Sequence, residues 1–247
     1  MDLLIFSGQS NMQGQTECDP KDTPIKNAYE YRLLSDSLVE LKNPVGEDVG
    51  YLLLGSHLSH GSLVPYFVDA YIKNTNRSAV AVHVAKGATI VEQFLKSSPI
   101  GIDRYNKLKE KVDSAISKVK DIDHIYFIWL QGESDALAKT SYDKYIKQMI
   151  ELKNNLKEDF HIEKFAIIEL GYFGYIEHTT YDYDEIIMKA QEDLPKIDKD
   201  FVLLTDICKK LSLDNSYINP EAAAHFNNKA MKMIGDDAGY KLAILTK

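Results

Sequence analysis

Five short, nearly continuous apolar runs constrain the fold of this chain more than any other feature. They lie at residues 3–6, 79–84, 125–130, 165–170 and 201–205. Strands with one solvent-exposed face alternate apolar and polar residues, whereas continuous apolar runs are typical of strands that are covered on both faces. We therefore expect a buried β-sheet.

Helical patterns lie between and after these runs. Apolar residues recur every three or four positions in segments 105–119, 142–156 and 231–242, which is the spacing of one helix face. Strands that alternate with helices of this length favour βαβ units with right-handed crossovers. The predicted fold class is α/β, a three-layer α/β/α sandwich around a five-stranded parallel sheet.

The stretch from about residue 15 to about residue 50 breaks this rhythm. Within it, residues 28–34 and 37–41 flank a short turn and could form a small hairpin outside the main sheet. No linker, repeat or shift in composition divides the 247 residues, and single α/β domains commonly reach this length. The prediction is one domain over residues 1–247, with a possible hairpin or loop insertion.

Charge and cysteine content exclude several classes of function. The chain has 29 basic and 37 acidic residues and a net charge of −8, so nothing favours a nucleic-acid or anionic-membrane partner. Cys18 and Cys208 are too few for a disulfide framework or a thiolate-rich zinc site. Neither a signal peptide nor a run of about 20 apolar residues is present. A cytoplasmic protein is expected, with a trimmed secreted form as the alternative and the oligomeric state left open.

Ligands of such folds bind beyond the carboxyl ends of the strands, so the residues that follow each strand are the candidates for chemistry. The first strand leads into SGQSNMQG at residues 7–14, which puts Ser10 at a strand-to-helix turn. Its hydroxyl could act there beside N–H groups that face an oxyanion. The alternative is that Ser10 only caps the helix.

Three further pieces lie later in the chain, two of them directly after predicted strands. Gly87 comes after the second strand, where a glycine can bring a bare N–H close to a ligand or simply make a turn. The third strand ends in WLQGESD at residues 129–135, and polar groups at a buried strand end are costly unless they are paired or functional. His225 precedes the last predicted helix, and a lone loop histidine usually faces solvent.

Together these pieces resemble the serine esterases of the SGNH (GDSL-like) hydrolase superfamily. Within it they are similar to the branch of sialate O-acetylesterases and family 6 carbohydrate acetylesterases, which includes acetylxylan esterase-like proteins. The resemblance rests on GQSNM at residues 8–12, Gly87, WLQGESD and His225, which occur in the family's order. It implies a flavodoxin-like sandwich and acyl transfer through an acyl-enzyme, with no metal or cofactor.

The resemblance also implies a role for each site residue. Ser10 would be the nucleophile, and His225 its general base and later the acid that protonates the leaving alcohol. The oxyanion hole would consist of the backbone N–H groups of Ser10 and Gly87 and the side-chain amide of Gln131.

The chain departs from the superfamily where an acid is expected to orient the histidine. Many members place Asp three residues before it, and this chain has Ala222 there. The resemblance assigns the role to Glu133, the acid of the QGES motif. The alternatives are that Glu133 only braces the loops, and that Glu221 or a backbone carbonyl orients His225.

Three readings of the function remain. The first is a carbohydrate O-acetylesterase acting on an acetylated sugar or oligosaccharide, the second a general short-chain carboxylesterase, and the third a non-catalytic sugar-binding relative. Tyr172 and Phe173 follow the fourth strand and could stack on sugar rings or belong to the core. The chain lacks G-x-G-x-x-G after the first strand and lacks a P-loop motif throughout, which argues against a nucleotide-binding enzyme.

Overall fold

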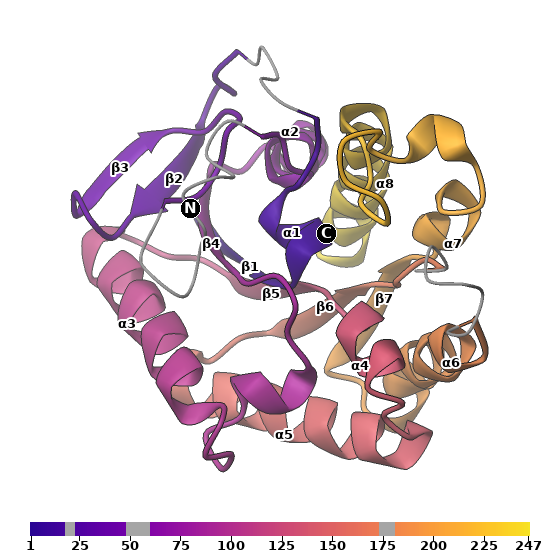
Figure 1. Cartoon of the computed structure of the whole chain (residues 1–247). Coiled ribbons are helices and arrows are strands. Elements are labelled where there is room, and N and C mark those ends of the chain that lie inside the picture. The colour runs from indigo at the N-terminus through magenta and orange to yellow at the C-terminus, as the bar shows by residue number, and fades with distance from the viewer. Residues whose placement is uncertain (18–22, 48–59, 173–180) are drawn as a thin grey trace.

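A computed structural model describes residues 1–17, 23–47, 60–172 and 181–247 of the chain. One sheet runs through the molecule in the strand order β3-β2-β4-β1-β5-β6-β7 (Figure 1). The strands are β1 (Asp2–Gly8), β2 (Ala28–Arg32), β3 (Ser37–Glu40), β4 (Ala79–Ala85), β5 (Ile125–Leu130), β6 (Lys164–Ile168) and β7 (Phe201–Thr205). All neighbouring pairs are parallel except β2 with β3.

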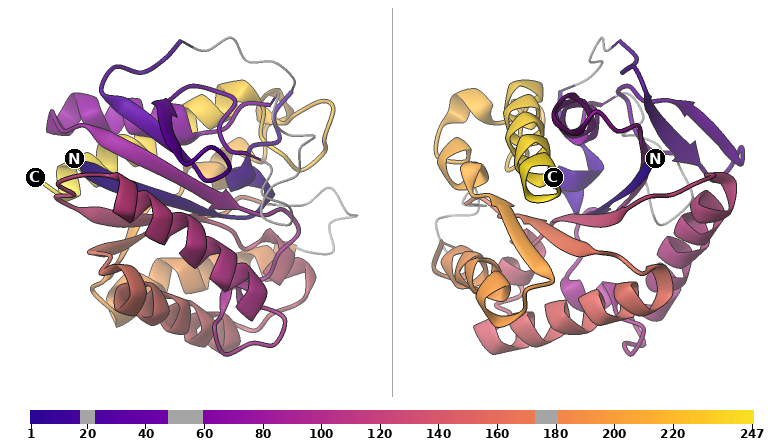
Figure 2. Two further views of the ribbon diagram at one scale, coloured as in Figure 1. Left: turned by 90° about the vertical axis from the view of Figure 1, so that its left-hand side faces the viewer. Right: turned by 180° about the vertical axis from the view of Figure 1, so that it is seen from behind.

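Helices cover both faces of this sheet. They are α1 (Ser10–Gln13), α2 (Val64–Thr75), α3 (Ile102–Lys118), α4 (Glu133–Leu137), α5 (Tyr142–Phe160), α6 (Tyr181–Ile197), α7 (Ile207–Leu211) and α8 (Asn228–Leu245), with 3₁₀ turns η2 (Val91–Phe94) and η3 (Asn215–Tyr217). Figure 2 shows α3, α5 and α6 on one face and α2 and α8 on the other. The predicted α/β/α sandwich is confirmed.

The central strand β1 illustrates why the apolar runs predict buried strands. Leu3 and Ile5 point into the core beneath α3 and α5, whereas Leu4 and Phe6 point into the core beneath α2 and α8. All four side chains are fully buried. A strand packed on both faces needs apolar residues at every position.

The predicted number of strands is wrong, because the sheet has seven strands rather than five. The two additional strands are the hairpin β2–β3, which was expected outside the sheet. It instead extends the sheet edge, with Ala28 opposite Ala79 and Glu30 opposite Ala81. Glu30 interrupts the apolar pattern that predicts a strand of the main sheet. Its carboxylate is fully buried, accepts from Gly46 N (2.6 Å) and pairs with Arg32 (3.2 Å).

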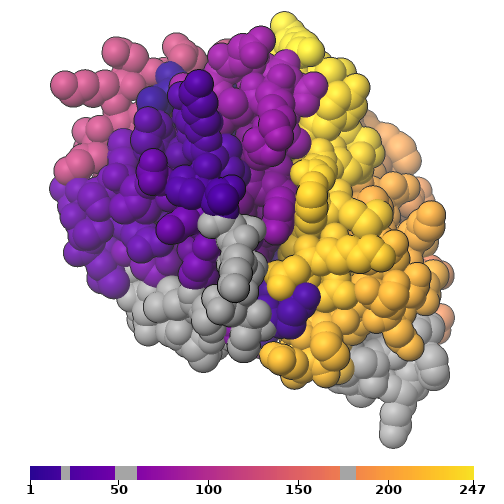
Figure 3. All heavy atoms as spheres, turned by 90° about the horizontal axis from the view of Figure 1, so that it is seen from above, coloured from indigo at the N-terminus to yellow at the C-terminus, as the bar shows by residue number. Residues whose placement is uncertain are grey.

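Helices α2 and α8 approach each other closely on their face of the sheet. Figure 3 shows α8 in yellow lying along α2 in purple across the surface. A Cβ added at Gly239 would lie 2.1 Å from the Phe67 carbonyl oxygen, and one at Gly235 would lie 2.6 Å from the Leu63 carbonyl oxygen. The glycines therefore set the distance between the two helices. None of the helices in the described residues is long and apolar enough to cross a membrane.

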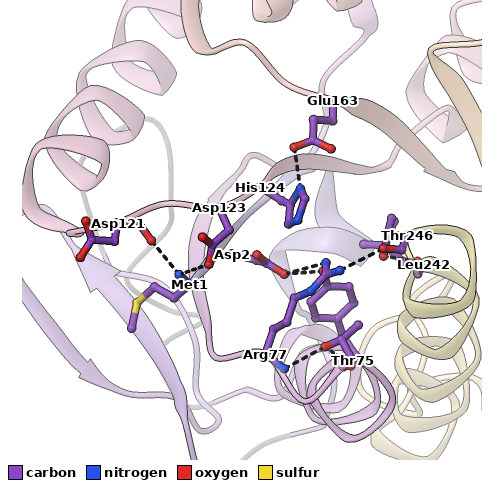
Figure 4. A network of polar contacts seen from close by, with 11 residues as sticks. Met1, Asp2, Thr75, Arg77, Asp121, Asp123, His124, Glu163, Leu242 and Thr246 are labelled. Carbon is purple, nitrogen blue, oxygen red and sulfur yellow. Dashed lines mark hydrogen bonds and ion pairs between the residues drawn. The ribbon is translucent and has the colours of Figure 1, made fainter.

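Polar contacts close the amino-terminal edge of the sheet (Figure 4). The terminal ammonium of Met1 donates to the Asp123 carboxylate (2.7 Å). Behind it, the hydroxyl of Tyr71 donates to the buried carboxylate of Asp2 (2.6 Å), which Arg77 approaches at 3.5 Å. These contacts tie the start of β1 to its neighbours, and the residues singled out in the sequence lie at the opposite, carboxyl edge.

Candidate active site

The turn out of β1 brings three strand ends together at the carboxyl edge. Gly8 has φ +143°, and a Cβ there would lie 2.0 Å from the Leu130 carbonyl oxygen of β5. Only glycine fits this close approach. Gly8 O accepts from Lys86 N beyond β4 (3.0 Å), and Gln9 N donates to Leu130 O (3.1 Å). The residues that follow β1, β4 and β5 therefore meet at one place.

Ser10, Gly87 and His225 line one hollow at this edge, with a volume of about 460 Å³. Ser10 is the first residue of α1 and is 5% exposed. Its N–H belongs to the first helical turn, where N–H groups have no acceptor within the helix. The other lining residues are Gln9, Gln15, Lys86, Ala88, Thr89, Arg104, Ser134 and Leu137.

Gly87 lies against Ser10, but its N–H already has an acceptor. A Cβ at position 87 would come within 3.3 Å of Ser10 Cβ and within 3.2 Å of Gln13 Oε1. The Gly87 N–H donates to the same Gln13 oxygen (2.8 Å). For this N–H to stabilise an oxyanion, as the sequence predicts, the Gln13 amide would have to move away.

His225 is held by the backbone of its own loop. Its ring Nδ1 lies 3.0 Å from the Ala223 carbonyl oxygen, and its backbone N–H donates to Ala222 O (3.2 Å). A protonated Nδ1 bonded to a carbonyl leaves Nε2 as the basic ring nitrogen. Burial lowers the pKa of the imidazole below its ordinary value of 6.5, so the neutral form is favoured. Ala222, where the superfamily places Asp, contributes only backbone to this turn.

Glu133, the predicted orienting acid, is not hydrogen-bonded to His225 in the part of the chain that the structure describes. Its Oε1 accepts from Asn11 Nδ2 (2.8 Å), and Asn11 Oδ1 accepts from the backbone N of Phe226 (3.2 Å). Glu133 is 2% exposed, and burial raises its carboxyl pKa. It lines a small separate cavity, together with Asn11, Tyr172 and Phe226. The other predicted candidate, Glu221, is exposed.

Gln131, the predicted side-chain donor of the oxyanion hole, is fully buried. Its Nε2 donates to Thr89 O (2.8 Å) and to Asp135 Oδ2 (2.6 Å), which accounts for both amide hydrogens. Gln131 is not among the lining residues of the Ser10 hollow. The described contacts therefore give it a bracing position between the ends of β4 and β5.

Gln9 is a candidate that the sequence reasoning missed. It lines the Ser10 hollow, and its Oε1 accepts from Ser134 N (3.1 Å). This bond orients the amide, and Nε2 has no hydrogen-bond partner among the described residues. The available signal was its position directly before Ser10 within GQSNM, but the sequence alone does not distinguish one strand-end glutamine from another.

Neither of the two aromatic residues predicted to bind sugar is among the described lining residues of the Ser10 hollow. Tyr172 borders a groove of about 570 Å³ with Asp206, Lys209 and Leu213, and its hydroxyl donates to Glu185 Oε1 (3.1 Å). Lys209 Nζ lies 6.0 Å from the ring centroid. Phe173 falls outside the described residues. Among those residues, no group of three or more His, Cys, Asp or Glu side chains could hold a metal ion.

Comparison with known proteins bears out the family resemblance. A model of the family described as "Carbohydrate esterase, sialic acid-specific acetylesterase" matches residues 1–241. No curated protein sequence matches the chain.

Several solved structures share the fold. A protein from Arabidopsis thaliana is 17% identical with a TM-score of 0.73, and the match covers 100% of this chain and 98% of that one. NanS is 13% identical with a TM-score of 0.70, over 99% and 97% of the two chains. XAC1771, a carbohydrate acetylesterase from Xanthomonas citri, is 14% identical with a TM-score of 0.58, over 98% of this chain and 55% of that one.

Proposed function

We propose that this chain, which belongs to the carbohydrate esterase family of sialic acid-specific acetylesterases, removes acetyl groups from sugar hydroxyls with Ser10 as its nucleophile. Family membership makes the protein a carboxylic ester hydrolase. The serine mechanism, the acyl-enzyme and the roles of single residues are our proposal. The observation that carries it is the shared hollow, which Ser10, Gly87 and His225 line although they are far apart in the sequence.

The reaction follows from the chemistry of these groups. His225 Nε2 accepts the Ser10 hydroxyl proton as Oγ attacks the acetyl carbonyl carbon. The tetrahedral intermediate collapses when the sugar oxygen leaves and takes the proton from His225. Water, activated by the same imidazole, then attacks the acetyl-serine, and acetate leaves with Ser10 restored. The two protonation states of His225 alternate, so no other proton carrier is required.

We assign the oxyanion to the Ser10 N–H and the Gln9 amide. Gln9 supports this role because it lines the hollow and its Oε1 is fixed by Ser134 N, so that Nε2 can face a ligand. Gln131 is a weaker choice, since both of its amide hydrogens have acceptors. Gly87 can contribute a third N–H once substrate displaces the Gln13 oxygen from it.

The substrate is proposed to be an acetylated acidic sugar. The description of the family names sialic acid, and one structural neighbour is titled a carbohydrate acetylesterase. Lys86 and Arg104 are the charged side chains among the described lining residues of the hollow, apart from the titratable His225. Their charge complements a carboxylate on the sugar, although the chain as a whole carries a net charge of −8.

The activity should depend on pH through His225. The imidazole must be neutral to accept the Ser10 proton, so kcat/KM should rise as pH increases through the imidazole pKa of the free enzyme. Because burial lowers that pKa, the rise should occur below 6.5, the ordinary value. A pH–rate profile with its acid limb above 6.5 would contradict the assignment.

One set of assays tests the function. Turnover of p-nitrophenyl acetate, butyrate and octanoate separates an acetylesterase from a longer-chain esterase and from an inactive binder. Ser10→Ala should abolish labelling by an organophosphate and lower kcat by several orders of magnitude, whereas the matched Ser134→Ala should still be labelled. An adduct on a serine other than Ser10 would overturn the proposal. Release of acetate from an O-acetylated sialic acid, compared with acetylated xylose, tests the acidic substrate.

A further inference from the structure

We propose that Glu133 acts on His225 through Asn11, as a positioning residue that fixes the histidine loop, while the Ala223 carbonyl orients the imidazole itself. This inference rests on the proposed function, because it concerns how the proposed base is held. It differs from the expectation that Glu133 contacts the ring as the third member of a triad.

A continuous chain of hydrogen bonds links Glu133 to the backbone beside His225. Glu133 Oε1 accepts from Asn11 Nδ2 (2.8 Å), and Asn11 Oδ1 accepts from Phe226 N (3.2 Å). Asn11 follows Ser10 directly. One amide therefore joins the helix that carries the nucleophile, the loop after β5 and the loop that carries the base.

Burial makes this chain a rigid connection. Asn11 is 3% exposed and Glu133 is 2% exposed, so water cannot readily replace either bond. Glu133 Oε2 has no hydrogen-bond partner in the described part of the chain. Among the described residues, Asn11 is therefore the one side chain that is hydrogen-bonded to the Glu133 carboxylate. The direction of the chain is fixed as well, because an amide donates through nitrogen and accepts through oxygen.

The loop that Asn11 holds needs such an anchor. Ala224 has φ +65°, a conformation that a residue other than glycine adopts only at a cost. It lies between Ala223, whose carbonyl accepts from the imidazole, and Phe226, whose N–H is bound by Asn11. Releasing Phe226 would let this strained turn relax. The Ala223 carbonyl and the ring bonded to it would then lose their fixed position relative to Ser10.

The polarity of the chain allows a test by exchange. In Asn11→Asp, the hydrogen bond from the Asn11 amide to the Glu133 carboxylate is lost, and two carboxyl groups face each other in its place. In the double variant Asn11→Asp/Glu133→Gln, the new amide can donate to the new carboxylate, whose second oxygen still accepts from Phe226 N. The double variant has the same formal charge and nearly the same atoms as the wild type. The chain of bonds is thus broken in one variant and rebuilt in the other.

We expect the following kinetics with p-nitrophenyl acetate. Asn11→Asp should lose about 10²-fold in kcat, the scale of a 1 Å misplacement. The loss should deepen as pH rises, because one carboxyl that is protonated at low pH can donate to the other, and its ionisation replaces that hydrogen bond with repulsion. Asp135, Tyr145 and Cys208, the other titratable groups beside Glu133, are the same residues in every variant. Glu133→Gln should keep kcat within about fivefold of wild type, since its oxygen still accepts from Asn11. The double variant should recover most of the loss.

A triad acid would behave differently. Glu133→Gln alone would then lose about 10⁴-fold in kcat and would lower the pKa of the acid limb, and the double variant would show no recovery. Either result overturns the proposal, and so does an Asn11→Asp variant with wild-type kcat. Thermal unfolding of each variant separates a misfolded chain from a mispositioned one. Glu163→Gln, at the opposite edge of the sheet, is the matched control for the chemical change.

A second readout keeps this inference separable from the proposed function. The ¹⁵N NMR shifts of His225 report its tautomer and pKa without any turnover. They should be the same in wild type, Glu133→Gln and the double variant, and should change in Asn11→Asp. If Ser10→Ala keeps full activity, the proposed function fails. If Ser10 is essential but these shifts and rates do not follow the exchange pattern, only the positioning role fails.

Discussion

Replacing Glu169 with glutamine should remove a loss of stability that the wild type suffers as pH rises. Glu169 directly follows β6, where its N–H donates to Thr205 O (2.9 Å). The side chain is fully buried, and neither carboxylate oxygen has a hydrogen-bond partner among the described residues. Burial, reinforced by the negative charges of Glu192 and Asp206, raises its pKa from 4.5 to about 7.

The size and sign of the effect follow from this pKa. The raised value means that the folded state favours the neutral carboxyl, so the contribution to stability is complete below pH 4.5, the ordinary pKa, and is lost as pH rises through about 7. At 1.36 kcal/mol per pKa unit, the whole loss is about 3 kcal/mol. Glutamine cannot ionise, and the cost of burying its amide hydrogens does not depend on pH. The unfolding free energy of Glu169→Gln, measured relative to that of the wild type, should therefore be about 3 kcal/mol higher at alkaline pH than at acid pH.

Urea unfolding at about pH 5 and about pH 8.5 measures most of this gain. Trp129 is the single tryptophan and is fully buried, so its fluorescence follows the loss of the core. Glu40→Gln, on the edge strand β3, controls for the loss of one carboxylate. If the difference in unfolding free energy between wild type and Glu169→Gln were the same at both pH values, the buried carboxyl would not be protonated in the fold and the reasoning would be refuted.

Four further substitutions test the geometry of the hollow and of the strand ends beside it. Gly87→Ala should lower kcat with little change in stability, because its Cβ would crowd Ser10 Cβ at 3.3 Å; unchanged kinetics would show that the hollow is wider than described. Gln9→Ala should lower kcat by about 10²–10³, whereas Gln131→Ala should mainly cost about 1–3 kcal/mol of unfolding free energy; the reverse outcome would return the oxyanion to Gln131. Gly8→Ala should cost more than about 3 kcal/mol, because its Cβ would lie 2.0 Å from a β5 carbonyl oxygen; urea unfolding near the wild-type midpoint would argue against this turn.

The sequence predicts the central strands and helices because burial on both faces leaves a simple mark. A run of apolar residues admits few other readings, and β1 has this form. The hairpin lacks such an apolar run, since β2 contains Glu30. The carboxylate of Glu30 is buried, and a hydrogen bond and an ion pair compensate its burial. β2 can lie within the sheet because donors such as Gly46 N satisfy the buried Glu30 carboxylate. The residues around β2 do not reveal those donors.

His225 precedes the last helix, so only the family resemblance placed it with Ser10 and Gly87. The meeting of Ser10 and Gly87 was predictable for a different reason. Parallel strands end at one edge, so residues that follow successive strands meet there. The choice between Gln9 and Gln131 was not predictable, because each follows a strand and each carries the same amide. What separates them is whether the side-chain amide already has acceptors among the described residues. Gln131 donates to Thr89 O, 42 positions away, and only the fold supplies that contact.

The alanine at position 222 is the most informative departure from the superfamily pattern. With a carbonyl instead of a carboxylate at His225 Nδ1, no full negative charge stabilises the imidazolium, which agrees with the lowered pKa of the ring. In the proposed mechanism the ground state gains from this arrangement, because the base is neutral and ready to accept the Ser10 proton. The cost is incurred in the transition state, where the imidazolium forms without a charged partner. That cation then relies on the oxyanion that forms in the same step, so the two charges stabilise each other only if the histidine loop holds its distance. Rigid anchoring of that loop by Asn11 is thus the feature that a site without Asp at position 222 most requires.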